Sequence, residues 1–426
     1  MRTAIVSDIH LGDEMCSLIN FETMAPEKNY EAFKEKAGQG NDYLILLGDI
    51  IDLSITNYEL AFKVAKAFFQ RIQKDGIAKS IIYVPGNHDF DLWHTVEHQI
   101  SIIHQIAEGR PPRSFRWSVP GLIDDRTASP TRGFHLPGVK PGVKTLIDPD
   151  HFVGTPMFLN AITQNKDGSG KTSFYFAYPN LYFVTERESI LITHGHYFEA
   201  YWTLVSEWIM KIARKDLAIG DALDIRELAA INSPLCQLAC TGVGQAGPLT
   251  PLVRAIQHEV KTHNVDRIEK YLECLDEEID KATRFGWRFW KEMGVDAISN
   301  YLKKAIPKGL LNMKDTRYNE DFIHEDAVLD RIRTYFAASW VEICDLNSQY
   351  GLNIPMPRKV IFGHTHQPMS WNDPAPRVSV VGDNAVSLYN TGGWLLHQHK
   401  GGGKELCGAA VFVYDSATGF TSHLVD

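Results

Sequence analysis

Five short runs of branched and aromatic apolar residues are spread along the chain, and each is followed at once by polar residues. A run of roughly four to eight such residues, bounded by glycine or polar side chains, predicts a β-strand. Because strand ends can meet at one edge of a sheet, we expect the polar residues that follow these strands to gather there. The five predicted strands are Thr3–Val6, Tyr43–Leu47, Ser80–Val84, Ser189–Thr193 and Lys359–Phe362.

A second pattern predicts helices between the strands, because apolar residues there recur about every 3.6 positions. It is clear over Tyr58–Lys74, where Leu60, Val64, Phe68 and Ile72 fall on one face. The same period predicts further helices at residues 90–107, 198–215, 221–231, 249–262, 265–290 and 321–348.

The two patterns also indicate how the chain is organised. Residues 110–172 follow neither period and are rich in proline, glycine and charge, which predicts a long irregular insertion, with room for short strands. Regular alternation returns with a hairpin predicted around Pro179 and Asn180. We therefore expect one domain formed by residues 1–196 and 353–426, interrupted by a helical insertion or lid at 197–352.

Composition narrows the class of protein. Apolar residues make up 44% of the chain, which is enough for a sizeable core, and 52 acidic against 43 basic residues give a net charge of -9. This balance disfavours a nucleic-acid partner, since such proteins usually present a basic face. No run reaches the length of a transmembrane helix and a strand begins at once, so we expect a cytoplasmic protein without a signal peptide. Six cysteines without a CxxC pair are expected to be reduced thiols.

Potential metal ligands follow all five strands. They combine carboxylates, an amide oxygen and imidazoles, a mixture that Mn, Fe and Zn accept. Two such ions about 3.5–4 Å apart form a hydrolytic site, where a bridging hydroxide attacks phosphorus while the cations neutralise the phosphoryl oxygens. The seven candidates are Asp8 and His10 in VSDIHLGD, Asp49 in LLGDIID, Asn87 in VPGNHD, His194 in LITHGH, and His364 and His366 in IFGHTHQP.

These residues and their neighbours also have structural interpretations. Asp8 would cap a turn after a strand, and Asn87 would adopt a left-handed turn beside Gly86. Asp52 in GDIID would cap a helix, and His88 in GNHD would be a hydrogen-bonded core histidine. The pairing of Asp8 with a histidine two residues later favours the ligand interpretation.

The ordered motifs DxH, GDxxD, GNHD, HG and GHTH, spread over residues 8–366, resemble those of the calcineurin-like metallophosphoesterases. The resemblance implies an α/β fold, namely an αββα sandwich of two mixed β-sheets flanked by helices, with a large helical insertion in this chain. It also implies two divalent metal ions, of the Mn, Fe or Zn type, and a phosphate-ester substrate.

The resemblance further implies a division of labour among the site residues. Asp8, His10 and His366 would bind one metal ion; Asn87, His194 and His364 would bind the other; and Asp49 would bridge them. His88 would stabilise the transition state or protonate the leaving oxygen, and Asp52 would orient it. The residue types agree with these roles, because imidazole suits acid chemistry near neutral pH and a carboxylate partner raises its pKa.

Two features depart from the family pattern. His196 stands where related enzymes often have aspartate after the HG glycine, and it is either a substrate contact, a neighbour of the ligands or a surface histidine. No arginine occurs in GDIIDL or GNHDF, where the family's protein serine/threonine phosphatases use arginine to grip phosphate, so that substrate class is disfavoured. Basic residues of the insertion at 110–172 would either bind the phosphate or form a solvated basic loop: Arg113, Arg116, Arg126, Arg132 and Lys140.

The helix predicted at 198–215 is the lid candidate, because it begins a few residues after His194. UDP-diacylglucosamine pyrophosphatases of this family carry a helical lid at the same place. A pyrophosphatase acting on a nucleotide-linked lipid is therefore the alternative function, with peripheral membrane or lipid contact through the insertion. The aromatic residues of the insertion would either line an acyl pocket or form its own core.

The favoured function is a metal-dependent phosphoester hydrolase, either a phosphatase or a phosphodiesterase, with manganese as the first ion to test. A non-catalytic scaffold is disfavoured because every ligand position and His88 are present. A nuclease is disfavoured by the acidic net charge.

Overall fold

The computed structural model describes residues 1–129, 132–137, 172–216, 223–243, 245, 321–398, 403–406 and 408–425. These residues belong to one compact unit, Met1–Gln245 together with Arg317–Asp426. The helices predicted at 249–262 and 265–290 lie outside the described residues, as does Lys140.

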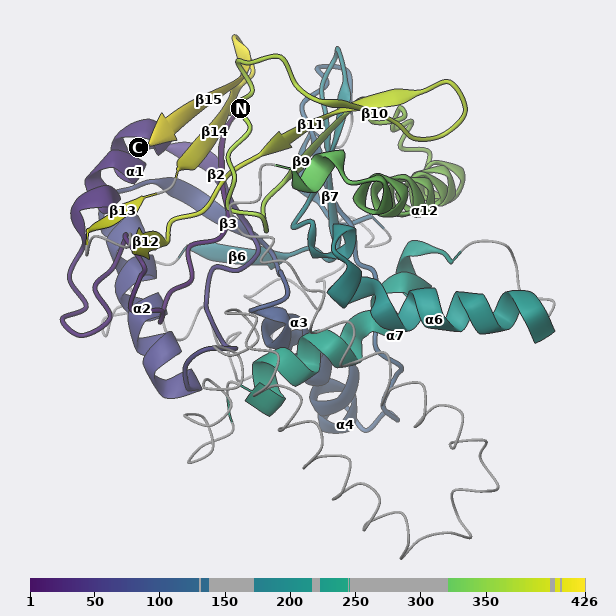
Figure 1. Cartoon of the computed structure of the whole chain (residues 1–426), viewed down its shortest axis with the longest axis horizontal. Coiled ribbons are helices and arrows are strands. Elements are labelled where there is room, and N and C mark those ends of the chain that lie inside the picture. Colours follow the sequence, from purple (N-terminus) through teal and green to yellow (C-terminus); the bar gives the residue numbers. More distant parts are fainter. Residues whose placement is uncertain are drawn as a thin grey trace, which may run out of the picture. The chain divides into compact units, whose positions relative to one another are not determined.

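The first sheet has the strand order β15-β14-β1-β2-β3-β6 (Figure 1). Strands β1, β2, β3 and β6 are parallel, whereas β14 and β15 add an antiparallel edge beside β1. The strands are β1 (Arg2–Val6), β2 (Asn41–Leu47), β3 (Ala78–Val84), β6 (Ser173–Phe176), β14 (Ala409–Asp415) and β15 (Gly419–Val425).

The second sheet has the order β10-β11-β9-β8-β7-β4-β5 and is also mixed. Parallel pairs join β11 to β9, β9 to β8 and β7 to β4, and antiparallel pairs complete the sheet. Its strands are β4 (Gly121–Asp124), β5 (Gly133–His135), β7 (Asn180–Val184), β8 (Ser189–Thr193), β9 (Lys359–Phe362), β10 (Arg377–Ser379) and β11 (Ala385–Asn390). Strands β12 (Leu396–Gln398) and β13 (Lys404–Leu406) form a separate pair.

An apolar core lies between the two sheets. Alternate residues of each strand enter it, while the residues between them pack under helices on the outer faces. Burial on both faces explains why the strands read as continuous apolar runs. The αββα sandwich of two mixed sheets flanked by helices is thus confirmed. The core between the sheets includes Ile5, Ile45, Ile82, Phe183, Ile192 and Ile361.

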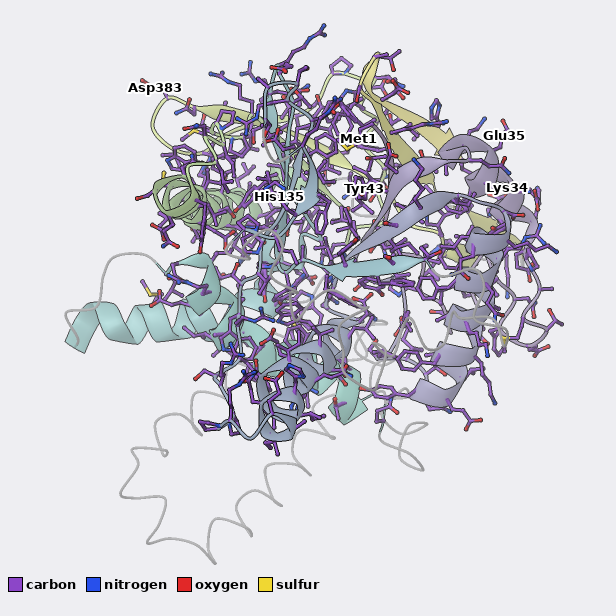
Figure 2. All side chains as sticks on the ribbon, turned by 180° about the vertical axis from the view of Figure 1, so that it is seen from behind. Met1, Lys34, Glu35, Tyr43, His135 and Asp383 are labelled. Atoms are coloured by element: carbon purple, nitrogen blue, oxygen red, sulfur yellow. The ribbon has the colours of Figure 1, made fainter. Side chains whose placement is uncertain are left out.

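Two helices cover the outer face of the first sheet. Helix α1 (Lys28–Ala37) buries Tyr30 and Phe33 and carries Lys34 and Glu35 at the outer rim of the molecule (Figure 2). Helix α2 (Tyr58–Lys74) has the predicted bounds, and it begins there because the Asn57 side chain accepts a hydrogen bond from the backbone N–H of Leu60. Their apolar faces complete the helical layer on this side.

The helix predicted at 90–107 is continuous but contains a π-helical turn. It consists of α3 (Phe90–His98), η1 (Gln99–Ile103) and α4 (His104–Ala107). It directly follows the GNHD segment, whose Asp89 is the N-cap residue of α3. The extra residue of the π turn shifts the helical face by one position.

The helices after β8 pack on the same compact unit. They are η3 (His196–Phe198), α6 (Ala200–Asp216), α7 (Ile225–Gln237), η4 (Leu238–Val243), η6 (Phe322–His324) and α12 (Asp326–Tyr350). Helix α7 begins with a capping box between Asp224 and Glu227. Helices α6, α7 and α12 correspond to the helices predicted at 198–215, 221–231 and 321–348, and their ends are shifted by a few residues. Among the described helices, none has both the length and the apolar character needed to cross a bilayer.

One local prediction is wrong. The turn at Pro179 and Asn180 does not close a hairpin, because β6 pairs with β3 in the first sheet whereas β7 pairs with β4 and β8 in the second. The turn carries the chain from one sheet to the other. Both strands are apolar on both faces, so local alternation could not tell pairing from crossing. In this segment the hairpin joins β7 to β8 instead, with Thr185 and Glu188 hydrogen-bonded across its turn.

Candidate metal centre

The seven candidate ligands converge at the carboxyl ends of β1, β2, β3, β8 and β9. Five of them have a left-handed backbone with φ between 52° and 69°, namely Asp8, His10, Asp49, His364 and His366. A non-glycine residue in such a conformation costs about 1–3 kcal/mol and persists where the surrounding structure enforces it, typically at functional sites. The backbone N–H groups of Asp8 and His10 donate to the carbonyls of Gly48 and Asp49, which fastens the first two loops together.

Asp8, His10 and His366 form one cluster of buried ligand atoms. The Nε2 atoms of His10 and His366 are 3.1 Å apart, and the His366 Nε2 lies 3.3 Å from an Asp8 carboxylate oxygen. The Asp8 carboxylate also accepts the backbone N–H of His364 at 2.9 Å and the hydroxyl of Ser7. These contacts place one carboxylate and two imidazoles around a common point.

Asp49, His194 and His364 form the second buried cluster. The His194 Nε2 is 3.2 Å from an Asp49 oxygen and 3.2 Å from the Asn87 side-chain oxygen. Its Nδ1 donates to the backbone carbonyl of Leu47 at 2.9 Å, which turns the Nε2 atom toward the cluster.

Glycines allow this crowding. A Cβ at Gly48 would overlap the His194 ring, and Gly48 also has φ +78°, which a side chain rarely adopts. A Cβ at Gly363 would overlap the Asp8 carboxylate. The glycines of GD and GHTH are therefore needed for the close approach of the ligands.

The charges of the site favour a cation. Burial raises the pKa of Asp49, but the neighbouring His194 and His88 outweigh it and hold the pKa well below its ordinary value. Burial lowers the pKa of His194, yet the carboxylates of Asp49 and Asp8 raise it to about 10. The buried carboxylates thus attract positive charge to this point.

His364 shows most directly that the residues fit metal ions. Its Nε2 hydrogen-bonds the Glu199 carboxylate at 2.6 Å. Its Nδ1 is buried and has no hydrogen-bond partner among the described residues. A carboxylate on one ring nitrogen commonly orients a histidine whose other nitrogen binds a metal. A buried imidazole nitrogen without a partner, in a cluster with two other ligand types, is what a cation would complete.

His88 and Asp52 lie beside the first cluster. One oxygen of Asp52 is 2.7 Å from the Nδ1 of His10 and 3.1 Å from the Nδ1 of His88, so one carboxylate orients both rings. The other oxygen accepts the Ser54 hydroxyl at 2.9 Å, and that hydroxyl also contacts the His88 Nδ1. The Asp52 side chain is fully buried, whereas His88 is 24% exposed, so His88 alone of the two can meet a substrate.

His196 is buried next to the second cluster, with ring centroids 5.5 Å from His194 and 6.5 Å from His364. The interpretation as a surface histidine is therefore wrong, because the tight turn after Gly195 folds the ring inward. Neither of its ring nitrogens has a hydrogen-bond partner within the described residues. Burial, together with His194 and His364, holds the pKa of His196 well below its usual value, so the ring is neutral.

Three of the arginines considered for phosphate binding are engaged elsewhere. Arg116 binds Glu97 at 2.6 Å, Arg126 binds Asp124 at 2.6 Å, and Arg132 binds Asp125 at 2.8 Å. Their partners are buried carboxylates, which explains this use of arginine.

Sequence reasoning missed Glu199 and Ser54. Glu199 is five residues beyond His194 and belongs to no motif, and only the 3₁₀ turn of η3 brings it to His364. Ser54 is two residues after Asp52, a spacing typical of a side chain that bonds back to an aspartate, and this signal was present in the sequence.

Comparison with known proteins agrees with the geometry. A family model described as calcineurin-like phosphoesterase matches residues 1–225, more than half of the chain. The matched part contains the ligands from Asp8 to His194, and His364 and His366 lie beyond it. No curated protein matches the chain.

Proposed function

The chain belongs to the calcineurin-like phosphoesterases, which hydrolyse phosphoric esters with two divalent metal ions, and from this membership we propose which residues hold the ions and which substrate they serve. Asp8, His10 and His366 are proposed to bind one ion, and Asn87, His194 and His364 the other. Asp49 is the bridging ligand. Support comes from the two clusters of buried ligand atoms, each of which combines a carboxylate with two imidazoles.

The proposed chemistry is hydrolysis by a hydroxide, with the ions supplying a water of lowered pKa and neutralising the phosphoryl oxygens. His88 is the proton donor to the leaving oxygen. Asp52 keeps the His88 Nδ1 occupied, fixing the orientation of the ring, and raises the basicity of the imidazole. The observation that carries this assignment is the partly exposed His88 ring on a fully buried carboxylate.

We favour a phosphate diester over a monoester as the substrate. A diester carries one negative charge, whereas a monoester carries nearly two at neutral pH because its second pKa is about 6. In the part of the chain that the structure describes, the candidate ligands and the group formed by His88, Asp52 and Ser54 consist of histidines, carboxylates, an amide and a serine. Arg116, Arg126 and Arg132 bind carboxylates elsewhere. His196 is buried beside the second cluster, so we propose that it packs against the candidate ligands His194 and His364 as a neutral ring.

The test compares hydrolysis of bis-p-nitrophenyl phosphate and p-nitrophenyl phosphate by the manganese-loaded wild type, His88→Ala and Asp49→Asn. We expect faster hydrolysis of the diester. Loss of the proton donor in His88→Ala should lower kcat about 10²–10⁴-fold, and Asp49→Asn should lower both activity and bound metal.

His423→Ala is the matched control, because His423 is an exposed histidine on β15. Equal activity of His88→Ala and wild type would contradict the role of His88. A preference for the monoester would contradict the substrate class while leaving the metal centre intact.

A pyrophosphatase acting on a nucleotide-linked lipid is the second candidate. It is favoured by the position of Trp202 on α6, which begins one residue after Glu199. The buried Trp202 ring has its centroid 6.4 Å from that of His196. An aromatic residue so close to the centre suits an apolar substrate, and UDP-diacylglucosamine is the probe. Activity on that lipid, with none on either nitrophenyl ester, would replace the diesterase proposal.

A further inference from the structure

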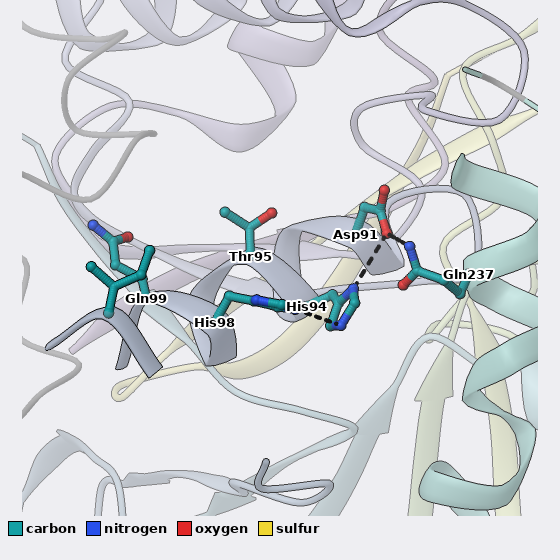
Figure 3. Close-up of a pocket in the computed structure, with 7 residues that line it drawn as sticks. Asp91, His94, Thr95, His98, Gln99 and Gln237 are labelled. Carbon is teal, nitrogen blue, oxygen red and sulfur yellow. Dashed lines mark hydrogen bonds and ion pairs between the residues drawn. The ribbon is translucent and has the colours of Figure 1, made fainter. Parts of the chain in front are cut away.

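A pocket of about 350 Å³ lies between α3 and the end of α7, apart from both ligand clusters. Figure 3 shows Asp91, His94 and His98 on successive turns of α3, with Gln237 of α7 facing them. The candidate centre uses none of these side chains. The pocket is lined by Asp91, His94, Thr95, His98, Gln99, Ile103 and Gln237.

The two histidines have the geometry of a chelating pair. They are four residues apart on a helix, and their Nε2 atoms are 3.1 Å apart. Two nitrogens bound to one tetrahedral zinc ion are about 3.3 Å apart, given bonds of about 2.0–2.1 Å. The edge of Phe115 packs on both rings, with centroid distances of 5.3 Å to His94 and 4.9 Å to His98, which restrains their rotamers.

Asp91 lies on the preceding turn of α3, next to this pair. One of its oxygens is 4.0 Å from the Nδ1 of His94, on the side of the ring opposite His98. A carboxylate on the distal nitrogen is the usual partner of a metal-binding histidine. Gln237 and Thr241 donate hydrogen bonds to the Asp91 carboxylate and hold it in place.

From this arrangement we infer that His94 and His98 form an accessory site for a divalent transition-metal ion such as zinc, with Asp91 as the positioning carboxylate and water completing the coordination in the pocket. The inference goes beyond the proposed function. The 3.1 Å distance between the two Nε2 atoms supports it, because both nitrogens can bind one ion.

The test is a zinc titration of the full chain in competition with a chromophoric chelator. The wild type should bind one more ion per chain than His98→Ala, or bind its weakest ion at least about tenfold more tightly. His98 is exposed, so its replacement should leave the fold intact, and circular dichroism checks this.

A rearranged variant, His98→Ala/Thr95→His, is the matched control, because it keeps the number of histidines but places them on consecutive residues, whose side chains do not face each other on a helix. It should bind like His98→Ala. Equal zinc binding by all three proteins would overturn the inference. The comparison does not depend on the proposed function, because a chain without the two-ion centre would still lose one ion in His98→Ala.

Discussion

At the residue scale, the candidate centre depends on how single acceptors fix the ring nitrogens of the histidines. Asp52 holds the Nδ1 of both His10 and His88, and the carbonyl of Leu47 holds the Nδ1 of His194. Glu199 holds the Nε2 of His364 instead, so this ring presents Nδ1. In His10, His194 and His364, hydrogen bonding of one nitrogen determines which nitrogen faces the cluster.

The Glu199–His364 contact leads to the first prediction at this scale. Glu199→Gln keeps the size of the side chain but removes the charge that favours a metal-binding imidazole. We expect the manganese concentration for half-maximal activity to rise about 10–100-fold, with kcat at saturating metal changed much less. Metal titration of the activity measures both.

Glu207→Gln is the control for this variant. Glu207 lies on α6, two turns beyond Glu199, but it binds Arg331 at 2.6 Å rather than a candidate ligand. It should leave the metal dependence unchanged. A fall of kcat in Glu199→Gln that saturating metal does not reverse would instead indicate a contact with substrate.

At the scale of elements, α12 is attached to the outer face of the second sheet by a polar network rather than by apolar contacts alone. Tyr335 of α12 hydrogen-bonds Thr193, the residue before His194, at 2.8 Å. Glu342, two turns further along, accepts the hydroxyls of Tyr182 and Ser118. The network ties the helix to the strand that carries a candidate ligand, so it positions β8 as well as α12.

Glu342 gives this network a pH dependence. Burial raises its pKa above the ordinary value of 4.5, so the folded state binds a proton that the unfolded state releases. Stability from this group is therefore present at low pH and is lost as pH rises from about 4.5 through the raised pKa. Glu342→Gln should remove this loss.

The measurement is the free energy of unfolding by urea at pH 5 and pH 8. We expect the wild type to lose more stability between these pH values than Glu342→Gln does. Glu22→Gln, which removes an exposed carboxylate, should behave like the wild type. Parallel pH profiles of all three proteins would contradict the assignment.

At the scale of the whole molecule, the candidate centre exists only after the two sheets have formed. His10 and His366 are in contact although 356 positions separate them in the chain. Buried Asp8 and Asp49 carry negative charge into the same place, which the proposed cations would offset. Metal binding should consequently act on the stability of the entire sandwich.

Removal of metal should therefore destabilise the protein. An ion that binds only the folded state, at 100 times its Kd, contributes about 2.7 kcal/mol. We expect EDTA to lower the Tm of the wild type by several degrees and added manganese to restore it. In Asp49→Asn the EDTA effect should be much smaller, and an unchanged Tm of the wild type would argue against metals held across both sheets.

The sequence by itself was sufficient for the five strands that precede the candidate ligands and for the family. Each ligand motif follows its strand within a few residues, so local order carries that information, and β8 and β9 have their predicted bounds. The pairing of β6 and β7 with different sheets, the Glu199–His364 contact and the inward turn of His196 required the tertiary structure. These features depend on which distant segments meet, and strands apolar on both faces do not specify their partners locally.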